Sequence, residues 1–537
     1  MILVILFLIC SVYLLFYKSK RHLHMLQQNL YNENNRYGKW LFKNYKLFID
    51  LDIIVLIVLL IGSLVELDSL IANILLLVIS IIALIVANRW NINIKNDQNK
   101  KPLVITPRIK RLLVTTTIIY LIPIVLLCIN YKDTTYVWLM LFIFFGLVYL
   151  NSLVLLLANY INVPVEALVT YHFYHMATNK LKSMPNLKVV GITGSYGKTS
   201  SKNILSDILN VKYNAFPTPK NLNTPKGTMI AINNHLDKFD EIFISEMGAY
   251  KRGEIKELCD FVHPKYGILT RIGTAHLATF GSQENIQKGK FELIESLPED
   301  GFGVLNGDDP LQVIYKLKNK VKVIWIGIDN KDVDVRATNI KCNNRGTNFE
   351  VIFKNDSKKY KFETKLLGKH NVYNILAGIA MGREFGISID ELQTAVRGVR
   401  AVEHRLELKR LGNFYQIDDA YNSNPVGAKS ALEVLKMMPG VKVVVTPGMI
   451  ELGEEEEKLN HEFGKEIAAA SDYVVLIGEK QTKPIMEGLK EEKFAKDKII
   501  VLNDVRKAYE FINGLAMSEK KEVYALFEND LPDTYNE

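Results

Sequence analysis

The segment 191–200, Gly-Ile-Thr-Gly-Ser-Tyr-Gly-Lys-Thr-Ser, constrains the fold of this chain more than any other stretch. The apolar run before it is typical of a buried strand, and the apolar residues after it have helical spacing. A glycine-rich turn between strand and helix predicts a phosphate cradle, because backbone N–H groups at a helix N-terminus bind anionic oxygens. Lys198 would neutralise the outer phosphates, and the Thr199 hydroxyl would reach Mg²⁺. The alternative is a glycine turn with an exposed lysine, which leaves the flanking strand and helix unexplained.

Composition narrows the class of protein. The formal net charge is +8, but many basic residues flank apolar segments, so membrane topology explains them better than nucleic-acid binding does. The four cysteines form no Cys-x-x-Cys pair, which argues against a disulfide framework or a zinc site.

Residues 1–161 hold nearly all the long apolar runs and predict a transmembrane region of about five helices. The second run is the shortest, because Asp50 and Asp52 restrict its apolar part to 53–65, and an interfacial or re-entrant helix is the alternative there. No ionisable residue lies in the middle of a run, so no ion path is indicated. The predicted segments are 2–17, 48–65, 70–87, 112–129 and 137–161.

Basic residues in the connecting loops predict the topology. They gather after the first segment and between the third and fourth, which places both loops in the cytoplasm and the N-terminus outside. Five crossings bring residue 162 out on the cytoplasmic side. Residues 162–186 have a helical apolar stripe and predict an interfacial linker helix. Within it, His172 and His175 are one turn apart, and packing explains them better than metal binding.

From residue 187 onward, short strands alternate with helical stretches, which predicts mostly parallel sheets covered by helices. Such sheets bind ligands at the carboxyl ends of their strands, where Glu246, His276 and Asp418 are expected. The expected strands are 188–193, 241–246, 266–271, 323–326, 414–418, 442–446, 473–477, 498–502 and 522–527.

A series of motifs in this part resembles the Mur ligase family of ATP-dependent amide-bond synthetases. The closest branch adds D-alanyl-D-alanine to UDP-N-acetylmuramoyl-tripeptide. The one-residue departure of the glycine loop from ordinary P-loop spacing, with Ile192 in place of the first glycine, is this family's own form. The resemblance implies a P-loop central domain at 187–400 and a Rossmann-like C-terminal domain at 401–537. It rests on segment 191–200, Glu-Met-Gly-Ala (246–249) with Gly-Glu-Ile (253–255), Ile-Gly-Thr-Ala-His-Leu (272–277), Leu-Asn-Gly-Asp-Asp (305–309), His-Asn-Val-Tyr-Asn (370–374), His-Arg-Leu-Glu (404–407), Asp-Asp-Ala-Tyr-Asn-Ser-Asn-Pro (418–425) and Met-Ile-Glu-Leu-Gly-Glu (449–454).

The resemblance implies a reaction in which a substrate carboxylate attacks the γ-phosphate of ATP and an amine captures the resulting acyl phosphate. ATP and Mg²⁺ are the implied cofactors. Thr199 and Glu246 would hold one Mg²⁺, and His276 with a carbamylated Lys290 would hold a second. Structural readings remain for each: a helix-capping carboxylate for Glu246, a packed histidine for His276 and a surface lysine for Lys290. The phosphates would be held by Gly194, Ser195, Gly197, Lys198, Thr199 and Ser200.

Other positions take their roles from the same resemblance. Asn306 and Asn371 would lie around the adenine. Arg405 and Asp418, with Asp419 beside them, would bring the second domain to the γ-phosphate and ribose after closure about a hinge near Ala401. The remaining polar cluster would either face the incoming amine or form an Asx turn before a proline; it consists of Tyr421, Asn422 and Asn424.

The chain departs from the family at its start, where the family has a soluble domain that holds the UDP part of the substrate. Here about 160 mostly apolar residues stand in that place. Two enzyme readings follow: a membrane-anchored ligase acting on a soluble muramoyl-tripeptide, or a ligase acting on a lipid-linked or surface-polymer substrate. Both predict a multi-pass protein of the bacterial cell membrane with its catalytic domains in the cytoplasm. A membrane transport or signalling ATPase is the alternative of another class, and the sequence does not indicate an oligomeric state.

Overall fold

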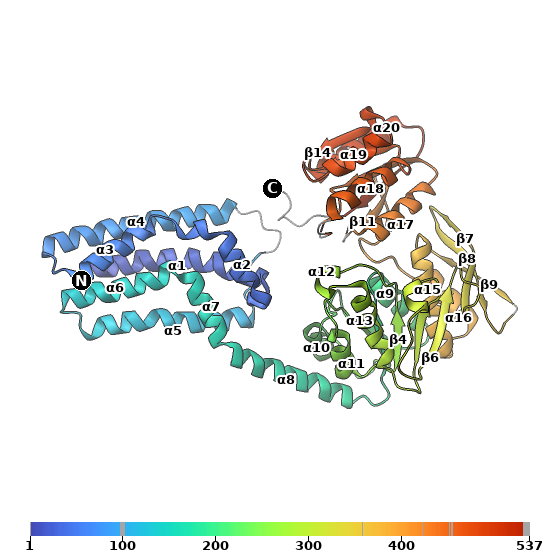
Figure 1. Ribbon diagram of the computed structural model, residues 1–537, viewed down its shortest axis with the longest axis horizontal. Helices are drawn as coiled ribbons and strands as arrows, with labels where there is room; N and C mark the ends of the chain where they lie inside the picture. The colour runs from blue at the N-terminus through green and yellow to red at the C-terminus, as the bar shows by residue number, and fades with distance from the viewer. Residues whose placement is uncertain are drawn as a thin grey trace. The chain divides into compact units, whose positions relative to one another are not determined.

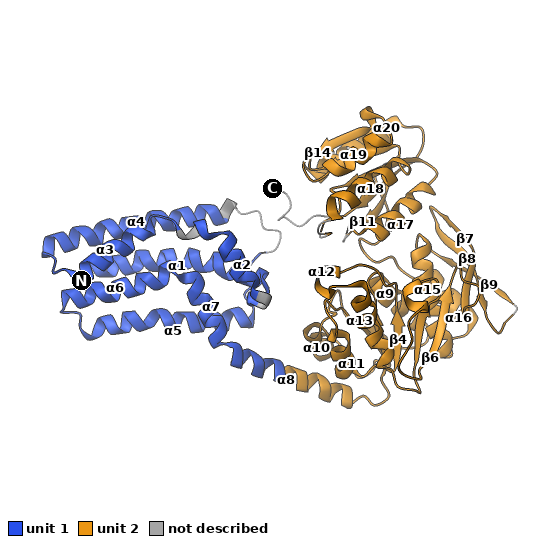
Figure 2. Ribbon diagram, viewed as in Figure 1, with its two compact units in different colours: residues 1–172 blue, residues 173–537 orange. Residues whose placement is uncertain are grey.

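The computed structural model describes residues 2–96, 102–356, 358–420, 423–450, 452 and 455–529. The chain forms two compact units, residues 1–172 and residues 173–537 (Figure 2). The first is helical, and the second contains two β-sheets covered by helices (Figure 1).

The helical unit packs its long helices side by side around an apolar core, with α1 against α4 and α3 against α6 (Figure 1). Phe7, Phe144 and Phe145 lie in that core, whereas Ile2, Leu70 and other large apolar side chains face outward. An exposed apolar surface of this kind is typical of helices that contact lipid. The elements are α1 Ile2–Gln28, η1 Leu30–Asn35, α2 Arg36–Lys43, η2 Tyr45–Phe48, α3 Asp52–Leu64, α4 Ser69–Asn96, α5 Pro107–Ile129, α6 Thr134–Tyr149 and α7 Asn151–Ile161.

All five predicted apolar segments are helical, but they do not form five continuous spans. By length and composition, α1, α4 and α5 can each cross a membrane. The fifth segment is divided into α6 and α7, which are bent by 80° and would make a fourth span only if counted together. The second, α3, has 13 residues and extends ~20 Å, less than the ~30 Å of a hydrocarbon core. The acidic residues at its start account for this shortness.

One of those acidic residues is buried in an ion pair. Asp52, 1% exposed, contacts the Lys18 ammonium of α1, which is 3% exposed. The ammonium also lies 5.7 Å from the Trp90 ring centroid and 5.2 Å from that of Tyr149. The pair therefore joins α1, α3, α4 and α6 at one level of the helical unit.

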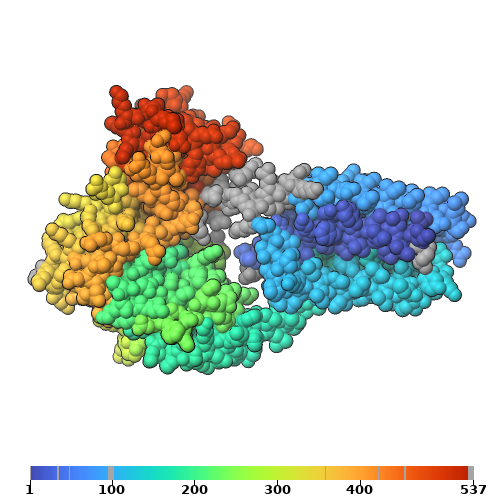
Figure 3. Space-filling view, turned by 180° about the vertical axis from the view of Figure 1, so that it is seen from behind, coloured from blue at the N-terminus to red at the C-terminus, as the bar shows by residue number. Residues whose placement is uncertain are grey.

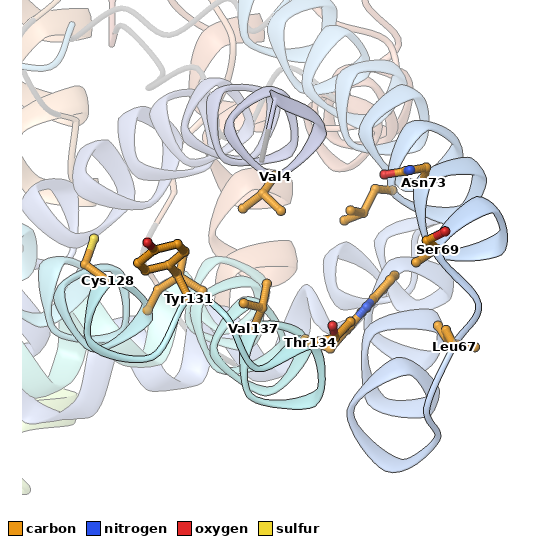
Figure 4. A pocket seen from close by; sticks show the side chains of 12 residues that line it. Val4, Leu67, Ser69, Asn73, Cys128, Tyr131, Thr134 and Val137 are labelled. Carbon is orange, nitrogen blue, oxygen red and sulfur yellow. The ribbon is translucent and has the colours of Figure 1, made fainter.

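A cavity of about 570 Å³ opens between the helices of this unit (Figure 4). Side chains from α1, α4, α5 and α6 line it, mostly apolar, with the neutral polar groups of Ser69, Asn73 and Thr134 at one side. No charged residue lines it among the residues that the structure describes. It is therefore unsuited to a nucleotide phosphate.

Helix α8 (Val163–Lys182) is the predicted linker helix, and the two units divide within it. Its first half pairs Glu166 with Arg111 of α5 at 2.7 Å. Its second half packs on the α/β unit, where Tyr174 stacks on Phe261 at 4.7 Å and Ala177 is fully buried. The helix is therefore shared by both units.

The first sheet has the strand order β2-β3-β1-β4-β5-β6-β7-β8-β9, parallel from β2 to β7. Alternate residues of its central strands enter opposite cores: Val190 and Ile244 pack with α9, α15 and α16, whereas Val189 and Phe243 pack with α10, α11 and α13. The strands are β1 Lys188–Thr193, β2 Ala215–Pro217, β3 Ile242–Glu246, β4 Tyr266–Leu269, β5 Phe302–Asn306, β6 Lys322–Gly327, β7 Val335–Asn343, β8 Gly346–Phe353 and β9 Lys359–Thr364. The helices are α9 Lys198–Leu209, α10 Pro225–Asn234, α11 Glu254–Val262, α12 Leu277–Phe280, α13 Gln283–Glu295, α14 Pro310–Val313, α15 Lys369–Glu384 and α16 Ile389–Gly398.

The second sheet has the order β10-β11-β15-β12-β13-β14, and all pairs except β10–β11 are parallel. Helices α17, α18 and α19 cover one face and α20 the other. The amide of Asn344, from the β7–β8 turn, donates to the Tyr524 hydroxyl at 3.1 Å, so the two domains adjoin (orange to red against yellow in Figure 3). The elements are β10 Glu407–Leu411, β11 Phe414–Asp419, α17 Pro425–Lys436, β12 Val441–Thr446, α18 Glu456–Ala468, β13 Tyr473–Ile477, α19 Lys483–Glu491, η4 Lys496–Lys498, β14 Ile499–Leu502, α20 Val505–Ser518 and β15 Val523–Glu528.

All nine predicted strands are confirmed, with ends shifted by up to two residues. The sequence analysis missed β2, β5, β10 and the antiparallel run β7–β8–β9. In β7 the alternation of buried and exposed residues changes phase where its register with β8 shifts, between Thr338 and Lys341.

The buried ion pair gives a test of the helical unit. Asp52→Asn leaves the Lys18 ammonium buried without a carboxylate, so we expect a loss of roughly 3–5 kcal/mol of stability. The double variant Lys18→Met/Asp52→Leu removes both charges and should lose much less. Unfolding of the purified protein in detergent, followed by tryptophan fluorescence, compares the two; equal stability of all three proteins would contradict the burial of this pair.

Candidate active site

The glycine loop joins β1 to α9, as predicted, and two of its glycines have backbone angles that favour glycine. Gly194 has φ 151° and Gly197, the N-cap of α9, has φ 81°. A Cβ atom on Gly194 would lie 1.9 Å from the Thr270 hydroxyl oxygen. That hydroxyl donates to the Tyr196 carbonyl at 2.7 Å, and the Ser195 amide donates to the Arg271 carbonyl at 2.9 Å. The end of β4 therefore holds the loop in place.

Lys198 is the first residue of α9, and its ammonium turns back over the loop. It donates to the carbonyls of Gly194 at 2.8 Å and Ser195 at 3.2 Å. Burial lowers its pKa, Glu246 opposes that shift, and Arg405 adds to it. The ammonium thus lies where an anion arriving at the helix N-terminus would replace the carbonyl contacts. Thr199 and Ser200 follow it in the first turn of the helix.

Glu246 ends β3 and is 1% exposed. Its Oε1 accepts hydrogen bonds from the Thr199 hydroxyl at 3.1 Å and from the Asn223 amide at 3.0 Å. A hydroxyl and a carboxylate oxygen side by side at a phosphate loop form a donor set that suits Mg²⁺. The residues present therefore fit the predicted first metal position. The helix-capping reading of Glu246 is not supported, since Gly253 is the N-cap of the next helix, α11.

The sequence analysis did not identify two residues that contact Glu246. One is Asn223, in the segment between β2 and α10. The other is Lys202, one turn along α9, whose Nζ lies 3.1 Å from Glu246 Oε2 and donates to the Lys220 carbonyl at 2.6 Å. Its four-residue spacing from Lys198 is the signal that could have revealed it, since residues four apart share a helix face.

His276 and Lys290 both lie near Lys198. Burial lowers the pKa of His276, and the charges of Lys198 and Lys290 lower it further, which favours the neutral imidazole that binds metals. Lys290, on α13, is 1% exposed and lies 5.4 Å from the Phe280 ring centroid; burial lowers its pKa to about 7. A buried side chain excludes the surface-lysine reading.

Among the described residues, no group of three His, Cys, Asp or Glu side chains could hold a metal ion. The predicted ligand sets do not require one, because they include a threonine hydroxyl and a modified lysine. His276 and an unmodified Lys290 alone do not make a metal site. The structure therefore fits the first predicted metal position directly and the second only with carbamylated Lys290.

Asn306 and Asn371, predicted near the adenine, are both largely buried. The Asn306 Oδ1 accepts from the Asp308 amide at 2.9 Å, and the Asn371 Nδ2 donates to the Leu367 carbonyl at 2.9 Å. The Tyr373 hydroxyl, on the same helix as Asn371, donates to Asp308 at 2.8 Å. This hydrogen bond joins the segment that contains Asn306 to the helix that contains Asn371. The side-chain amides of Asn306 and Asn371 themselves form hydrogen bonds to nearby backbone groups.

In the second domain, Asp418 lies near the end of β11 and is 4% exposed. Its Oδ2 is 2.9 Å from His404 Nδ1 and 3.0 Å from Lys409 Nζ, and neither partner had been singled out. Asp418 is therefore already neutralised by a cation of β10. Arg405 follows His404, close enough to Asp419 to oppose the rise in its pKa.

Asp419 and Glu528 are register partners at the parallel ends of β11 and β15. Burial raises the pKa of Asp419 to about 6, and burial with the neighbouring Asp419 raises the pKa of Glu528. The Ser423 hydroxyl donates to Glu528 at 2.6 Å, and the Glu528 carboxyl group also interacts with Asp419. The sequence analysis did not identify Glu528 as the neighbour of Asp419.

Tyr421 and Asn422 lie outside the described residues. Asn424 is the N-cap of α17 and accepts from the Gly427 amide at 2.9 Å. This is the turn chemistry offered as the alternative to amine binding, and it occupies the Asn424 oxygen.

The glycine loop, the Glu246 carboxylate and the buried Lys290 lie in one domain built on a mostly parallel sheet, and a second α/β domain follows it. A glycine loop between a strand and a helix, with a Lys-Thr pair at the helix start, is typical of the class of P-loop nucleotide-binding proteins. The sequence matches the Mur ligase middle domain over residues 192–382 and the Mur ligase glutamate ligase domain over residues 404–523. The chain belongs to the Mur ligase family through these two domains.

Named relatives support the same branch. The UDP-N-acetylmuramoyl-tripeptide--D-alanyl-D-alanine ligase of Bacillus subtilis is 33% identical over 285 residues, 52% of this chain and 60% of that protein. The Escherichia coli ligase of the same name is 31% identical over 54% of this chain and 64% of that protein. The chain thus spans about three fifths of the length of these relatives.

Solved structures agree on the fold. MurF from Acinetobacter baumannii superimposes with a TM-score of 0.59 at 25% identity, covering 67% of this chain and 77% of that one. MurF ligase from Thermotoga maritima, solved in complex with ADP, gives a TM-score of 0.58 at 27% identity, covering 67% and 80%.

The raised pKa of Asp419 predicts a pH-dependent stability. Because its folded-state pKa of about 6 exceeds the unfolded value of 3.8, its contribution is full below pH ~4 and is lost as pH rises through 6. Asn at position 419 does not titrate, so Asp419→Asn lacks this pH-dependent contribution to stability. The melting temperature of the variant minus that of the native protein should therefore increase from pH 4 to pH 7. Asp504→Asn is the matched control: Arg506 lowers the pKa of Asp504, so that difference should fall over the same interval. A flat difference for Asp419→Asn would contradict the burial of this carboxyl group.

Proposed function

We propose that this protein is an ATP-dependent, ADP-forming amide ligase of cell-wall precursor synthesis that adds D-alanyl-D-alanine to a muramoyl-tripeptide through an acyl phosphate. The proposal rests above all on the contact between the Thr199 hydroxyl and the buried Glu246 carboxylate beside the glycine loop. The substrates are those in the names of its relatives.

The residues of the loop gather and orient the anions. Amides of the segment from Gly194 to Ser200 and the Lys198 ammonium hold the phosphates of ATP, so the substrate carboxylate and the γ-phosphate meet at the end of α9. Thr199 and Glu246 hold Mg²⁺, which neutralises charge on the phosphate oxygens when bound. The walls of the site must then keep water from the acyl phosphate until the amine attacks.

Lys290 and His276 form the second metal position of the proposal. Carbamylation of Lys290 turns a buried cation into an anion, and the Lys198 ammonium nearby would stabilise it. His276 supplies a neutral nitrogen ligand beside it.

The second domain completes the site by closing over the first. Arg405 then reaches the γ-phosphate, where a planar guanidinium suits the transition-state charge, and Asp418 reaches the ribose. The hinge is the segment near Ala401, between α16 and β10.

A membrane location is part of the proposal. We propose a multi-pass protein of the bacterial cell membrane with both α/β domains in the cytoplasm, where ATP is available. The apolar lengths of α1, α4 and α5 support membrane insertion. The second candidate function, ligation onto a lipid-linked or surface-polymer substrate, is favoured by these same helices. A transport or signalling ATPase is less well supported, because metal and phosphate positions of a ligase accompany the loop.

One experiment separates these functions. The full-length protein in detergent receives ATP, Mg²⁺ and D-alanyl-D-alanine, with either soluble UDP-muramoyl-tripeptide or the lipid-linked muramoyl-tripeptide. We expect pentapeptide product and ADP with the soluble substrate, detected by mass spectrometry. Product from the lipid-linked substrate alone would favour the second candidate, and ATP hydrolysis independent of the amine would favour an ATPase.

Lys198→Ala tests the site itself. Without the ammonium the phosphates lose their principal cation, so we expect phosphate release to fall by about 100-fold or more. The melting temperature and membrane insertion should stay close to those of the native protein, because the hydrogen bonds of the Lys198 ammonium to described residues go to carbonyls of its own loop. Normal turnover would refute the assignment of this loop.

A further inference from the structure

Lys202 is a buried cation that the proposed reaction does not use. It lies one turn beyond Lys198, is 1% exposed, and contacts Glu246 Oε2 at 3.1 Å and the Lys220 carbonyl at 2.6 Å. A buried ammonium is costly unless it is paired, so these two contacts fix it against Glu246.

The two oxygens of Glu246 therefore have different surroundings. Oε1 faces the Thr199 hydroxyl and the Asn223 amide, which are neutral donors. Oε2 faces the Lys202 ammonium. Mg²⁺ at Thr199 and Oε1 would meet a carboxylate whose negative charge is already balanced within ion-pair distance.

Nearby charges increase this effect. The Lys198 ammonium lies close enough to interact with Glu246, and Arg405 adds positive charge from the second domain. In the described part of the chain, no further carboxylates join Glu246 in a metal-binding group. Without nucleotide, the positive charges of Lys198, Lys202 and Arg405 around the loop therefore outnumber the negative charge of Glu246, which favours phosphate anions over a divalent cation.

We propose that Lys202 balances the charge of Glu246, so that the nucleotide-free protein has little affinity for Mg²⁺ and the metal binds only together with nucleotide phosphates. The inference rests on the proposed function, because ATP is the anion that restores the metal's affinity. Lys202 acts through Glu246 and touches no reacting atom, so it is a positioning residue. The proposal therefore predicts an order of binding, in which the nucleotide phosphates bind together with the metal or before it.

The test measures metal binding to the full-length protein in detergent, with Mn²⁺ as the probe and electron paramagnetic resonance to count free ions. Lys202→Gln keeps a donor for the Lys220 carbonyl but removes the charge, whereas Lys202→Arg keeps the charge. Without nucleotide, we expect Lys202→Gln to bind Mn²⁺ about tenfold or more tightly than the native protein, and Lys202→Arg to match the native protein. With ADP present, the difference between the variants should shrink.

Controls separate charge from packing. Lys256→Gln removes a lysine from an exposed ion pair with Asp260 on α11 and should leave Mn²⁺ binding unchanged. Lys202→Met, a second neutral variant, should show the same gain as Lys202→Gln, so the result does not depend on the folding of one protein. A melting curve for each variant confirms that the folded protein is measured.

Two results would overturn the proposal. One is equal Mn²⁺ affinity in the native protein and both neutral variants. The other is a gain of the same size in Lys202→Arg, because that gain would come from loosened packing. Trypsin cleavage after Lys220 reports such loosening directly, since Lys202 holds the carbonyl of the bond that trypsin cuts. None of these measurements needs the carboxylate or amine substrate, so their results do not depend on the outcome of the ligase assay.

Discussion

The buried carboxylate of Glu246 is the interaction on which the catalytic unit depends. It stands at the end of a central strand and joins α9, through Thr199 and Lys202, to the loop that carries Asn223. A charge in this position is tolerated only because each oxygen has partners. The same carboxylate thus holds three segments together and is the group that the proposed function assigns to Mg²⁺, so in this proposal stability and metal binding depend on a single side chain.

The catalytic core could be predicted because its signals are local. A buried parallel strand corresponds to a short apolar run in the sequence, and the glycine loop has a fixed place between strand and helix. These two signals predicted β1, α9 and the proximity of Thr199 and Glu246. The β7–β9 strands were not predicted, because tertiary pairing, rather than local pattern, forms them. Lys202 and Glu528 were missed for a related reason, because their partners Glu246 and Asp419 are far away in sequence. His404 and Lys409 meet Asp418 through the pairing of β10 with β11, and β10 had not been predicted.

The helical unit shows the limits of composition in another way. Hydropathy identified every apolar segment correctly, but it carries no information on bends, and the break at Leu150 between α6 and α7 has no proline to mark it. Two acceptors near the break have a partner from another helix: the Tyr120 hydroxyl of α5 lies within hydrogen-bond distance of Asn151 Oδ1, at 2.8 Å, and of the Leu147 carbonyl, at 3.3 Å. Such compensation depends on the packed bundle and cannot be read from one segment.

The cavity in the helical unit has a consequence for chemical labelling. Cys128 lies in its wall and is exposed, whereas Cys259, in the core of the α/β unit, is buried, and its burial raises the pKa of the thiol to about 12. Because the thiolate is the reactive form, a maleimide dye reaches Cys128 long before Cys259. The native chain therefore carries its own attachment point for a fluorophore beside this cavity, with no cysteine needing to be introduced there.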